Sequence, residues 1–404
     1  MIDKMVPIST VVWFQEGPGV RNTQYTNEGV KLLNVANLVD GEVDLSNTSR
    51  YVSEEEAYGK YKHFLVDKGD LIIASSGIKV DYFDKKMGFA KEEHLPLCMN
   101  TSTIRFKTLD TDVLDIRYFM YFLKSESFKQ QLSIQITGSA QLNFGPSHLK
   151  KMNVKLVPIA QQRDIVYRLS RIDHLISLRK QQLSKLDELV KSRFIELFGD
   201  PKLNDKGWTV SALGEYMTLL TDFSANGSYE LLDSNVVMYD EPNYAVMVRT
   251  TDLEAGDLTN GVKYIDQAAY ELLSKSKLFG GELIMNKIGS AGKIYIMPQI
   301  DKPASLGRNA FMFRFDDRIN MAYLYALLSS DYGTKEIQQY VRGAVTKTIT
   351  KESTRSIRVI VPPIELQEQY AAFVEQTDKS KVEIQKSLAK LETLKKALMQ
   401  KYFG

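Results

Sequence analysis

Few residues of this 404-residue sequence have the types and spacing that catalysis requires. The four histidines form no HxH or HExxH pattern and have no cysteine at metal-ligand spacing, so no metal site is predicted. The segment GSAGK at 289–293 is similar to a phosphate-binding loop but lacks the GxxxxGK[ST] spacing. No GxSxG nucleophile elbow occurs. We therefore expect no catalytic residue, no metal and no cofactor bound by this chain.

Polar residues beside glycine and aromatic residues gather in several loops, and such side chains contact the phosphates and base edges of nucleic acid. Any one such loop is more often a solvated turn, so the prediction depends on matching places in the two halves. In the first half the DNA-contact candidates are Lys79, Tyr82, Lys85, Lys86, Gln141 and Asn143. In the second half they are Asn286, Lys287, Ser290, Lys293, Arg308, Asn309, Arg342, Thr346, Lys347 and Thr348.

An internal repeat relates the two halves. An offset of 205 residues (403 − 198) aligns Phe198-Gly199 with Phe403-Gly404, which close the lysine-rich stretches LDELVKSRFIELFGD and LETLKKALMQKYFG. The same offset aligns VKLVPIAQQ (154–162) with VIVPPIELQ (359–367). In the interior the offset drifts to 212 (281 − 69), where GDLIIASSG aligns with GELIMNKIG. The sequence therefore predicts a duplicated scaffold that carries variable loops.

The elements that must position these loops follow the same order in each half. Short runs rich in Val, Ile and aromatic residues predict strands of a compact sheet domain. Helix-like runs at 115–132 and 319–340 follow, then a glycine-led loop, a last strand, and a long helix that begins near Pro158 or Pro363. The predicted fold class is α+β, with two tandem α/β domains, each followed by a long helix. The predicted boundaries are 1–158, 159–200, 201–362 and 363–404.

Apolar residues in the two long helices recur with a spacing close to a heptad. A helix with one apolar stripe must bury that stripe against a partner, and the other copy is the nearest candidate. We expect the helices to pair as an antiparallel intramolecular coiled coil with pseudo-twofold symmetry. The predicted seam consists of Ile165, Leu169, Ile172, Ile176, Leu183, Leu186, Val190, Leu197, Val374, Ile384, Leu388, Leu391 and Leu398, interrupted by Thr377, Lys381 and Lys395.

Composition sets outer limits on function. The formal net charge of +2 neither requires nor excludes nucleic acid, because 52 Lys and Arg residues can still form a local basic face. The single cysteine, Cys98, excludes an internal disulfide and fits a reducing cytoplasm. No run of about 18 apolar residues is present, so no membrane span is predicted. We expect a cytoplasmic protein.

The whole pattern resembles the specificity subunit of Type I restriction–modification systems. The likeness rests on the helix starts VPIAQQRDI and VPPIELQEQ, on the two helix endings, on GDLIIASSG and GELIMNKIG, and on WTVSALGEY (208–216), and it covers essentially the whole chain. The helix start of the family usually reads Pro-x-x-Glu-Gln-x-x-Ile. Here Gln161-Gln162 and Leu366-Gln367 stand in place of Glu-Gln, and Tyr370 stands where isoleucine is common.

The resemblance implies two target recognition domains, each reading one half of a bipartite, asymmetric site in double-stranded DNA, with helices that set the unread spacer. It implies a non-catalytic subunit that docks two modification subunits, which bind S-adenosylmethionine and methylate adenine. In the complete complex, restriction subunits add cleavage that depends on ATP and Mg. Two alternatives remain open: a structural coiled-coil protein that does not bind DNA, and a self-sufficient DNA methyltransferase or nuclease.

Overall fold

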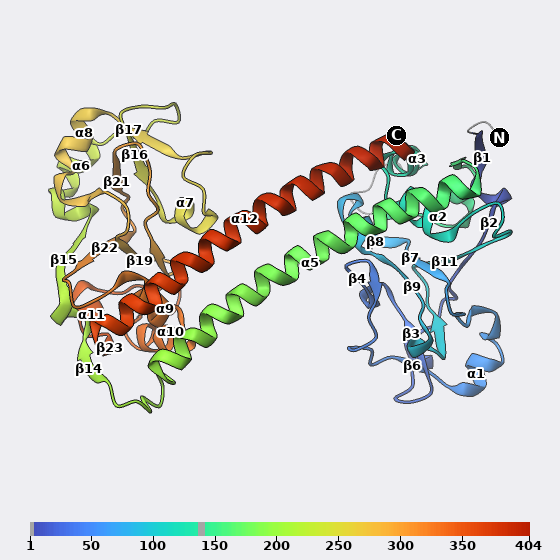
Figure 1. Cartoon of the computed structure of the whole chain (residues 1–404), viewed down its shortest axis with the longest axis horizontal. Helices are drawn as coiled ribbons and strands as arrows, with labels where there is room; N and C mark the ends of the chain where they lie inside the picture. The colour runs from blue at the N-terminus through green and yellow to red at the C-terminus, as the bar shows by residue number, and fades with distance from the viewer. Residues whose placement is uncertain (1–3, 136–141) are drawn as a thin grey trace. The chain divides into compact units, whose positions relative to one another are not determined.

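The computed structural model describes residues 4–135 and 142–404, which form a mixed α and β structure (Figure 1). The chain divides into two compact units. Unit 1 consists of Met1–Lys180 and Gln385–Gly404, and unit 2 of Gln181–Ile384. Both units contain short strands, short helices and parts of both long helices, in agreement with the predicted mixed fold class.

Unit 1 contains a four-stranded antiparallel sheet and a three-stranded sheet. The first has the order β2 (Val12–Glu16), β11 (Thr103–Thr108), β7 (Leu71–Ala74) and β9 (Met87–Phe89). The second has the order β10 (Leu97–Met99), β3 (Val30–Leu33) and β6 (Tyr51–Val52). Three strand pairs complete the unit: β1 (Lys4–Pro7) with β13 (Asn153–Leu156), β8 (Ser76–Ile78) with β12 (Leu142–Asn143), and β4 (Leu38–Val39) with β5 (Glu42–Val43).

Unit 2 repeats the two larger sheets and one of the strand pairs, and its second sheet has one additional edge strand. Its antiparallel sheet has the order β15 (Met217–Asp222), β22 (Ala310–Phe315), β19 (Leu283–Asn286) and β20 (Ile294–Ile296). Its second sheet has the order β17 (Lys263–Ile265), β16 (Ala245–Val248), β21 (Ala304–Leu306) and β18 (Lys277–Leu278). The strands β14 (Thr209–Ala212) and β23 (Arg358–Val361) pair as β1 and β13 do in unit 1.

Helices cover the sheets of each unit. Unit 1 has α1 (Glu54–Tyr58), α2 (Ile116–Leu123), α3 (Glu126–Gln135) and α4 (Pro146–Leu149). Unit 2 has α6 (Tyr229–Asn235), α7 (Thr250–Ala255), α8 (Gln267–Leu272), α9 (Met321–Ser329), α10 (Asp331–Gln338) and α11 (Lys351–Arg355). The core of unit 1 joins Phe119 of α2 to Phe106 of β11 and to Leu169 of the first long helix. The helix α2 therefore links the sheet to the long helix.

The predicted helix-like runs at 115–132 and 319–340 are each two helices. Ser125 ends the first helix of its run, because its Oγ donates to the carbonyl of Phe122 at 2.6 Å and accepts from the N–H of Phe128. Ser330, at the 205-residue offset, does the same with Leu327 and Gly333. A serine hydroxyl that competes for backbone groups favours a helix boundary. The helical character of both runs is confirmed, and these serines place a boundary within each run that the sequence analysis did not identify.

A buried glutamine anchors the start of each long helix. Gln162 accepts from the N–H of Asp115 at 2.9 Å and donates to the carbonyls of Val113 and Val157. Gln367 makes the same three bonds with Asn320, Arg318 and Pro362, all at the 205-residue offset. Both side chains are fully buried. The glutamine kept in the motif therefore fastens the long helix to the turn that precedes α2 or α9.

We expect Gln162→Leu to lower the free energy of unfolding of unit 1 by about 3 kcal/mol, because it removes one buried and two part-buried hydrogen bonds and leaves one N–H and two carbonyls without this partner. Hydrogen exchange of the α2 amides measures the loss. Gln161→Leu is the matched control, since the neighbouring glutamine is exposed and its change should stay within about 0.5 kcal/mol. Equal exchange in the two variants would refute a structural role for Gln162.

The long helices are α5 (Ile159–Phe198) and α12 (Ile364–Phe403), and each contributes to both units. The predicted separate helical regions, 159–200 and 363–404, are therefore divided between the two compact units. Within unit 1, the end of α12, including Phe403, packs with Ile165 and Leu169 near the start of α5. Within unit 2, the end of α5, including Phe198, packs with Tyr370 near the start of α12.

The direction of the two helices follows from contacts inside each unit. In unit 1, Phe403 packs against the start of α5. Lys395, which precedes Phe403 in α12, forms an ion pair at 2.7 Å with Asp173, which lies later in α5. In unit 2, Lys381 pairs with Asp187 at 2.8 Å. The helices therefore run antiparallel within each unit. The two lysines that interrupt the apolar seam each face an aspartate of the other helix.

Candidate nucleic-acid interface

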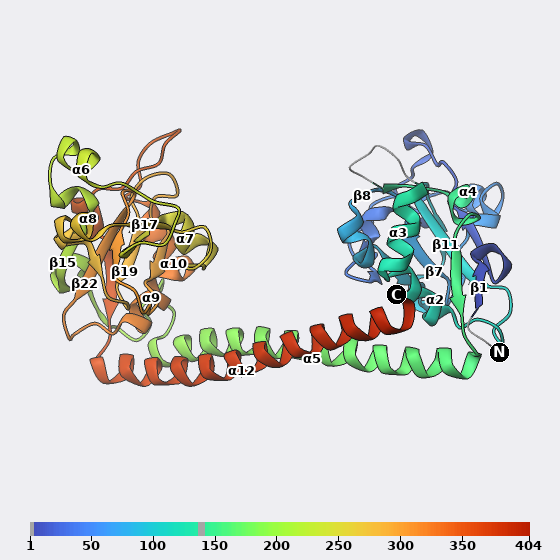
Figure 2. The same cartoon turned by 90° about the horizontal axis from the view of Figure 1, so that it is seen from above.

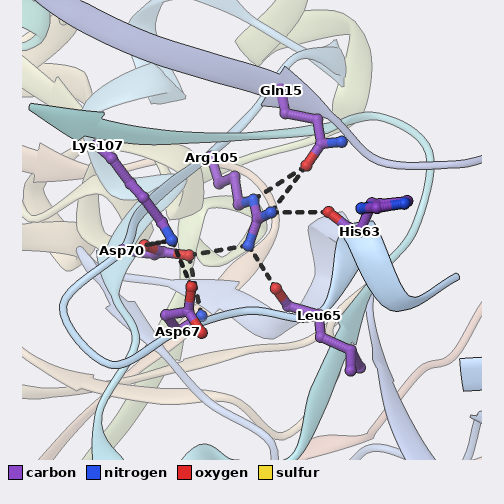
Figure 3. A network of polar contacts seen from close by, with 7 residues as sticks. All are labelled: Gln15, His63, Leu65, Asp67, Asp70, Arg105 and Lys107. Carbon is purple, nitrogen blue, oxygen red and sulfur yellow. Dashed lines mark hydrogen bonds and ion pairs between the residues drawn. The ribbon is translucent and has the colours of Figure 1, made fainter. Parts of the chain in front are cut away.

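A buried arginine organises the sheets of unit 1 (Figure 3). Arg105 of β11 pairs with Asp70 at 3.2 Å, and the two side chains are only 7% and 3% exposed. The guanidinium also donates to the carbonyl of His63 at 2.8 Å, to the carbonyl of Leu65 and to the side chain of Gln15. Because Leu65 bridges to Cys98 of the second sheet, Arg105 ties the two sheets together.

The carboxylate of Asp70 belongs to the same network. Its Oδ2 accepts from the backbone N–H of Asp67 at 3.0 Å, which fixes the turn before β7. Burial raises the pKa of Asp70 above its ordinary value, although that backbone hydrogen bond and the charges of Lys107 and Arg105 act in the opposite direction. These contacts therefore hold the start of β7 in place, and with it the loop that follows this strand.

Unit 2 contains the same device with one change of residue. Arg314 of β22 pairs with Glu282 at 3.0 Å and donates to the carbonyl of Lys277 in the second sheet. Glu282 accepts from the N–H groups of Phe279 and Gly280, as Asp70 does from Asp67. The unit 2 arginine is more accessible, with its side chain 37% exposed. The duplicated arginine–carboxylate pair therefore fixes the start of β7 in unit 1 and of β19 in unit 2 in the same way, and with it the start of the loop that follows each strand.

The polar loops predicted from the sequence meet in both units. In unit 1, Asn143 of β12 pairs with Ser76 of β8. In unit 2, Thr348 pairs with Ile288, and these positions correspond to Asn143 and Ser76 at the offsets of 205 and 212. The carbonyl of Lys347 also accepts from the N–H of Gly289 at 2.9 Å. Because the sequence predicts that they contact DNA, we call 75–86 and 142–143 the unit 1 reading loops, and 287–293 and 342–348 the unit 2 reading loops.

Figure 2 places these loops in each unit on the side away from the long helices, at β8 in unit 1 and at the orange-red loop after α10 in unit 2. That arrangement leaves the loops accessible to a partner that does not touch the helices. The predicted candidates of unit 1 are mostly exposed there. Lys79, Tyr82 and Asn143 are exposed, and Tyr82 has 54% of its surface accessible.

Two unit 1 lysines contact the protein itself. Lys85 lies 3.7 Å from Asp40 in an exposed ion pair. Lys86 donates to the carbonyl of Leu38 at 2.8 Å and is half-buried. Gln141, the remaining candidate of unit 1, lies outside the described residues.

Unit 2 candidates fall into three groups. The exposed ones, on or beside the reading loops, are Ser290, Asn309, Arg342, Thr346, Lys347 and Thr348. Lys293 and Arg308 are partly exposed but pair with Glu254 and Asp233. Asn286 is only 3% exposed, and the side chain of Lys287 is 14% exposed. The last two were expected to contact DNA, but their burial assigns them to the interior of the unit.

Lys287 belongs to a buried ion network that the sequence did not reveal. Its Nζ lies 2.8 Å from Oδ2 of Asp222, and Nζ of Lys351 lies 2.8 Å from Oδ1 of the same carboxylate. The partners are 65 and 129 residues away from Asp222 along the chain. Their only sequence signal is that Lys287 and Lys351 flank the two reading loops of unit 2.

The pKa of Asp222 makes the stability of unit 2 depend on pH. Burial favours the neutral carboxyl, but hydrogen bonds from Lys287 and Lys351 outweigh burial and hold the pKa below its ordinary value. A carboxyl with a lowered folded pKa contributes stability that is fully present above its unfolded pKa, about 3.9, and is lost as pH falls through the folded pKa.

We therefore expect the free energy of unfolding of unit 2 to decrease as the pH is lowered below about 4. In Asp222→Asn this decrease should be smaller, because the variant has no carboxylate to protonate at this position. Chemical denaturation at a series of pH values, followed by Trp208 fluorescence in unit 2, measures it. Asp317→Asn, an exposed aspartate of the same unit, serves as the control and should retain the wild-type slope. Parallel pH profiles for wild type and Asp222→Asn would contradict the assignment.

The exposed side chains on these loops are mainly hydrogen-bond donors. Exposed lysine, arginine, amide and hydroxyl groups donate to phosphates and to base edges. In the part of the chain that the structure describes, no group of histidine, cysteine, aspartate and glutamate could hold a metal ion. None of the described helices is long and apolar enough to cross a bilayer.

The sequence model of the family described as the Type I restriction modification DNA specificity domain matches residues 25–188 and 206–396. The chain belongs to this family. The two matched segments follow the internal repeat, one in each half of the sequence. The specificity subunit that the sequence resembled is thereby confirmed as the family of this chain.

Curated relatives and solved structures agree with this assignment. The Type I restriction enzyme MjaVIII specificity subunit of Methanocaldococcus jannaschii is 25% identical over 71% of this chain and 69% of its own length. The putative MjaX specificity subunit of the same organism is 21% identical over 92% of this chain and 85% of its own. The S subunit of a Type I system from M. genitalium has the same fold, with a TM-score of 0.58, 17% identity, and coverage of 100% of this chain and 96% of its own.

A second solved structure supports the same fold. It comes from work on complex assembly and conformational transition of the Type I R-M system. Its TM-score is 0.57 at 15% identity, and the match covers 99% of this chain and 97% of that chain. The fold of the specificity family therefore extends over the full sequence.

Proposed function

We propose that this specificity subunit reads a bipartite, asymmetric site in double-stranded DNA, one half-site with each unit. The observation that carries the proposal is the duplication of the reading loops: each unit joins two polar loops through an equivalent strand contact, Asn143 with Ser76 and Thr348 with Ile288. The frame is duplicated, whereas the exposed side chains on it differ. Two equivalent frames with different polar side chains are suited to two unlike half-sites.

The helices α5 and α12 supply the remaining parts of the proposed role. Their length fixes the unread spacer between the half-sites, and their accessible faces dock two modification subunits that bind S-adenosylmethionine and methylate adenine. Restriction subunits, with ATP and Mg, complete the complex. The chain itself is a non-catalytic subunit that acts in the cytoplasm, where the DNA substrate lies.

The test is adenine methylation across the genome of a host with and without this gene, with the modification subunit expressed in both. Loss of one bipartite motif on deletion is the expected result, and it would give both half-sites and the spacer. An unchanged pattern of adenine methylation would overturn the proposal.

Two other functions predict different results. A structural coiled-coil protein predicts no salt-dependent binding of duplex DNA by the complex with its modification subunits. A self-sufficient methyltransferase predicts that the purified chain alone transfers a methyl group from labelled S-adenosylmethionine to DNA. We expect salt-dependent binding by the complex and no transfer by the chain alone.

A further inference from the structure

Asp222 connects three separate segments of unit 2. It is the last residue of β15, and its two carboxylate oxygens each accept from a different lysine at 2.8 Å. Lys287 opens the first reading loop of unit 2, and Lys351 opens α11 directly after the second. One carboxylate therefore binds the lysine at the start of the first loop and the lysine just after the second.

The network is partly withdrawn from water, so its charges depend on one another. The side chain of Asp222 is 8% exposed, that of Lys287 is 14% exposed and that of Lys351 is 31% exposed. A carboxylate with so little access to water is stable only when it is paired and hydrogen-bonded. The Lys287 ammonium also lies over the ring of Phe311, 5.7 Å from its centroid.

In unit 1, different side-chain contacts connect the two reading loops. The positions equivalent to Lys287 and Lys351 are Ser75 and Pro146, which carry no charge. There Phe83, on the first reading loop, packs on Phe128 and Phe144 with ring centroids 5.6 and 6.1 Å apart. The backbone contacts match in the two units, since Phe144 donates to Ser75 as Ile349 donates to Lys287. Aromatic packing therefore holds the two loops of unit 1 together, with a Lys129–Asp84 ion pair at 2.9 Å on the first loop, whereas one carboxylate joins both loops of unit 2.

We propose that Asp222 is a positioning residue for sequence reading by unit 2: it holds Lys287 and Lys351, and thereby fixes both unit 2 reading loops in one geometry. This inference rests on the proposed function, because it assigns the loops of each unit to one half-site. Asp222 lies beneath the loops and does not itself contact DNA. Its removal should affect one half-site and leave the other unchanged.

The first experiment uses the complete complex of this chain with its modification subunits. Duplexes carry the wild-type motif or a single base change in one half-site, and the initial methylation rates give the discrimination at each position. Asp222→Asn is expected to lower discrimination about tenfold at one half-site, since one well-placed base contact contributes about that factor. Discrimination at the other half-site should stay within about twofold. Equal loss at both half-sites, or no loss, would overturn the inference.

Two variants make the result specific. Glu16→Gln is the matched control, since Glu16 ends the corresponding strand β2 and forms no ion pair among the described residues of unit 1. It should change neither half-site. In Lys351→Gln, Asp222 and Lys287 still form an ion pair whose charges cancel. This variant should therefore fold even if Asp222→Asn does not. It should lower discrimination at the same half-site by a smaller factor.

Hydrogen exchange of the free chain tests the positioning role without any assumption about DNA. In Asp222→Asn, amides of 287–293 and 342–350 should exchange about tenfold faster, whereas those of 75–77 and 142–145 should not change. Unchanged exchange in the unit 2 loops would refute the positioning role. Failure of the wild-type complex to methylate a bipartite motif would refute the proposed function instead, so the two failures are distinguishable.

Discussion

Phe403→Ala should lower the free energy of unfolding of unit 1 by about 4 kcal/mol, and Phe198→Ala should lower that of unit 2 by a similar amount. Phe403 is 3% exposed and lies 5.0 Å from the ring of Tyr118. Phe198 is fully buried and lies 4.6 Å from the ring of Tyr323, the repeat counterpart of Tyr118. Each substitution leaves a cavity at the junction of the long helices and a sheet domain.

Hydrogen exchange resolves the two units and is the measurement of choice. Phe403→Ala should accelerate exchange in α2, and Phe198→Ala should accelerate exchange in α9. Leu394→Ala and Leu189→Ala are the controls on the same helices, because these leucines are 48% and 49% exposed, and their loss should cost less than about 1 kcal/mol. A loss in the phenylalanine variants no larger than in the leucine controls would show that the terminal aromatic residues do not anchor the helices.

Arg105→Met should destabilise unit 1 by about 3–5 kcal/mol, because it leaves the buried carboxylate of Asp70 without its arginine. Arg314→Met should cost unit 2 less, about 1–2 kcal/mol, since the Arg314 side chain is 37% exposed and Glu282, itself only 4% exposed, keeps its hydrogen bonds from the N–H groups of Phe279 and Gly280. Denaturation of each variant, followed by hydrogen exchange in β7 and β19, compares the two costs.

The pH dependence of Arg105→Met has a defined sign. The folded-state pKa of Asp70 is already raised by burial, and loss of Arg105 raises it further. A carboxyl with a raised folded pKa binds a proton more tightly in the folded state, so stability increases as pH falls. The deficit of Arg105→Met should therefore shrink at low pH.

The double variant Arg105→Met/Asp70→Leu separates the pair from its parts. Replacing both partners by apolar residues should recover part of the loss, since the carboxylate is gone while the carbonyls of His63 and Leu65 still lack their donor. If Arg105→Met destabilises unit 1 no more than Arg314→Met destabilises unit 2, the greater burial of Arg105 does not increase the contribution of its ion pair to the free energy of unfolding.

Repeated positions explain how much could be predicted from the sequence. The 205-residue offset aligned Phe198 with Phe403 and Gln162 with Gln367, and in the structure each pair makes equivalent contacts. The offset of 212 aligned Asp70 with Glu282, the two carboxylates that pair with Arg105 and Arg314. The sequence showed that these positions correspond, but it gave no sign that they are buried or paired.

The reading loops show what residue type alone does not determine, namely which side chains are exposed. Asn143 and Asn286 were both DNA-contact candidates, yet Asn143 is exposed and Asn286 is buried. Asp222 was not a candidate, although it organises both unit 2 loops. An amide or a lysine has the same sequence signature whether it faces solvent or an aspartate from another strand.

The sequence by itself determined the mixed fold class, the duplication, the order of the elements and the loops that vary between the two halves. These follow from local patterns: strand and helix periodicity, turn residues, and a constant offset between similar segments. Only the tertiary structure decided which polar side chains remain exposed, where the predicted helices break, and which charges neutralise one another. Those outcomes depend on contacts between residues such as Asp222 and Lys351, 129 positions apart, and burial sets their energy.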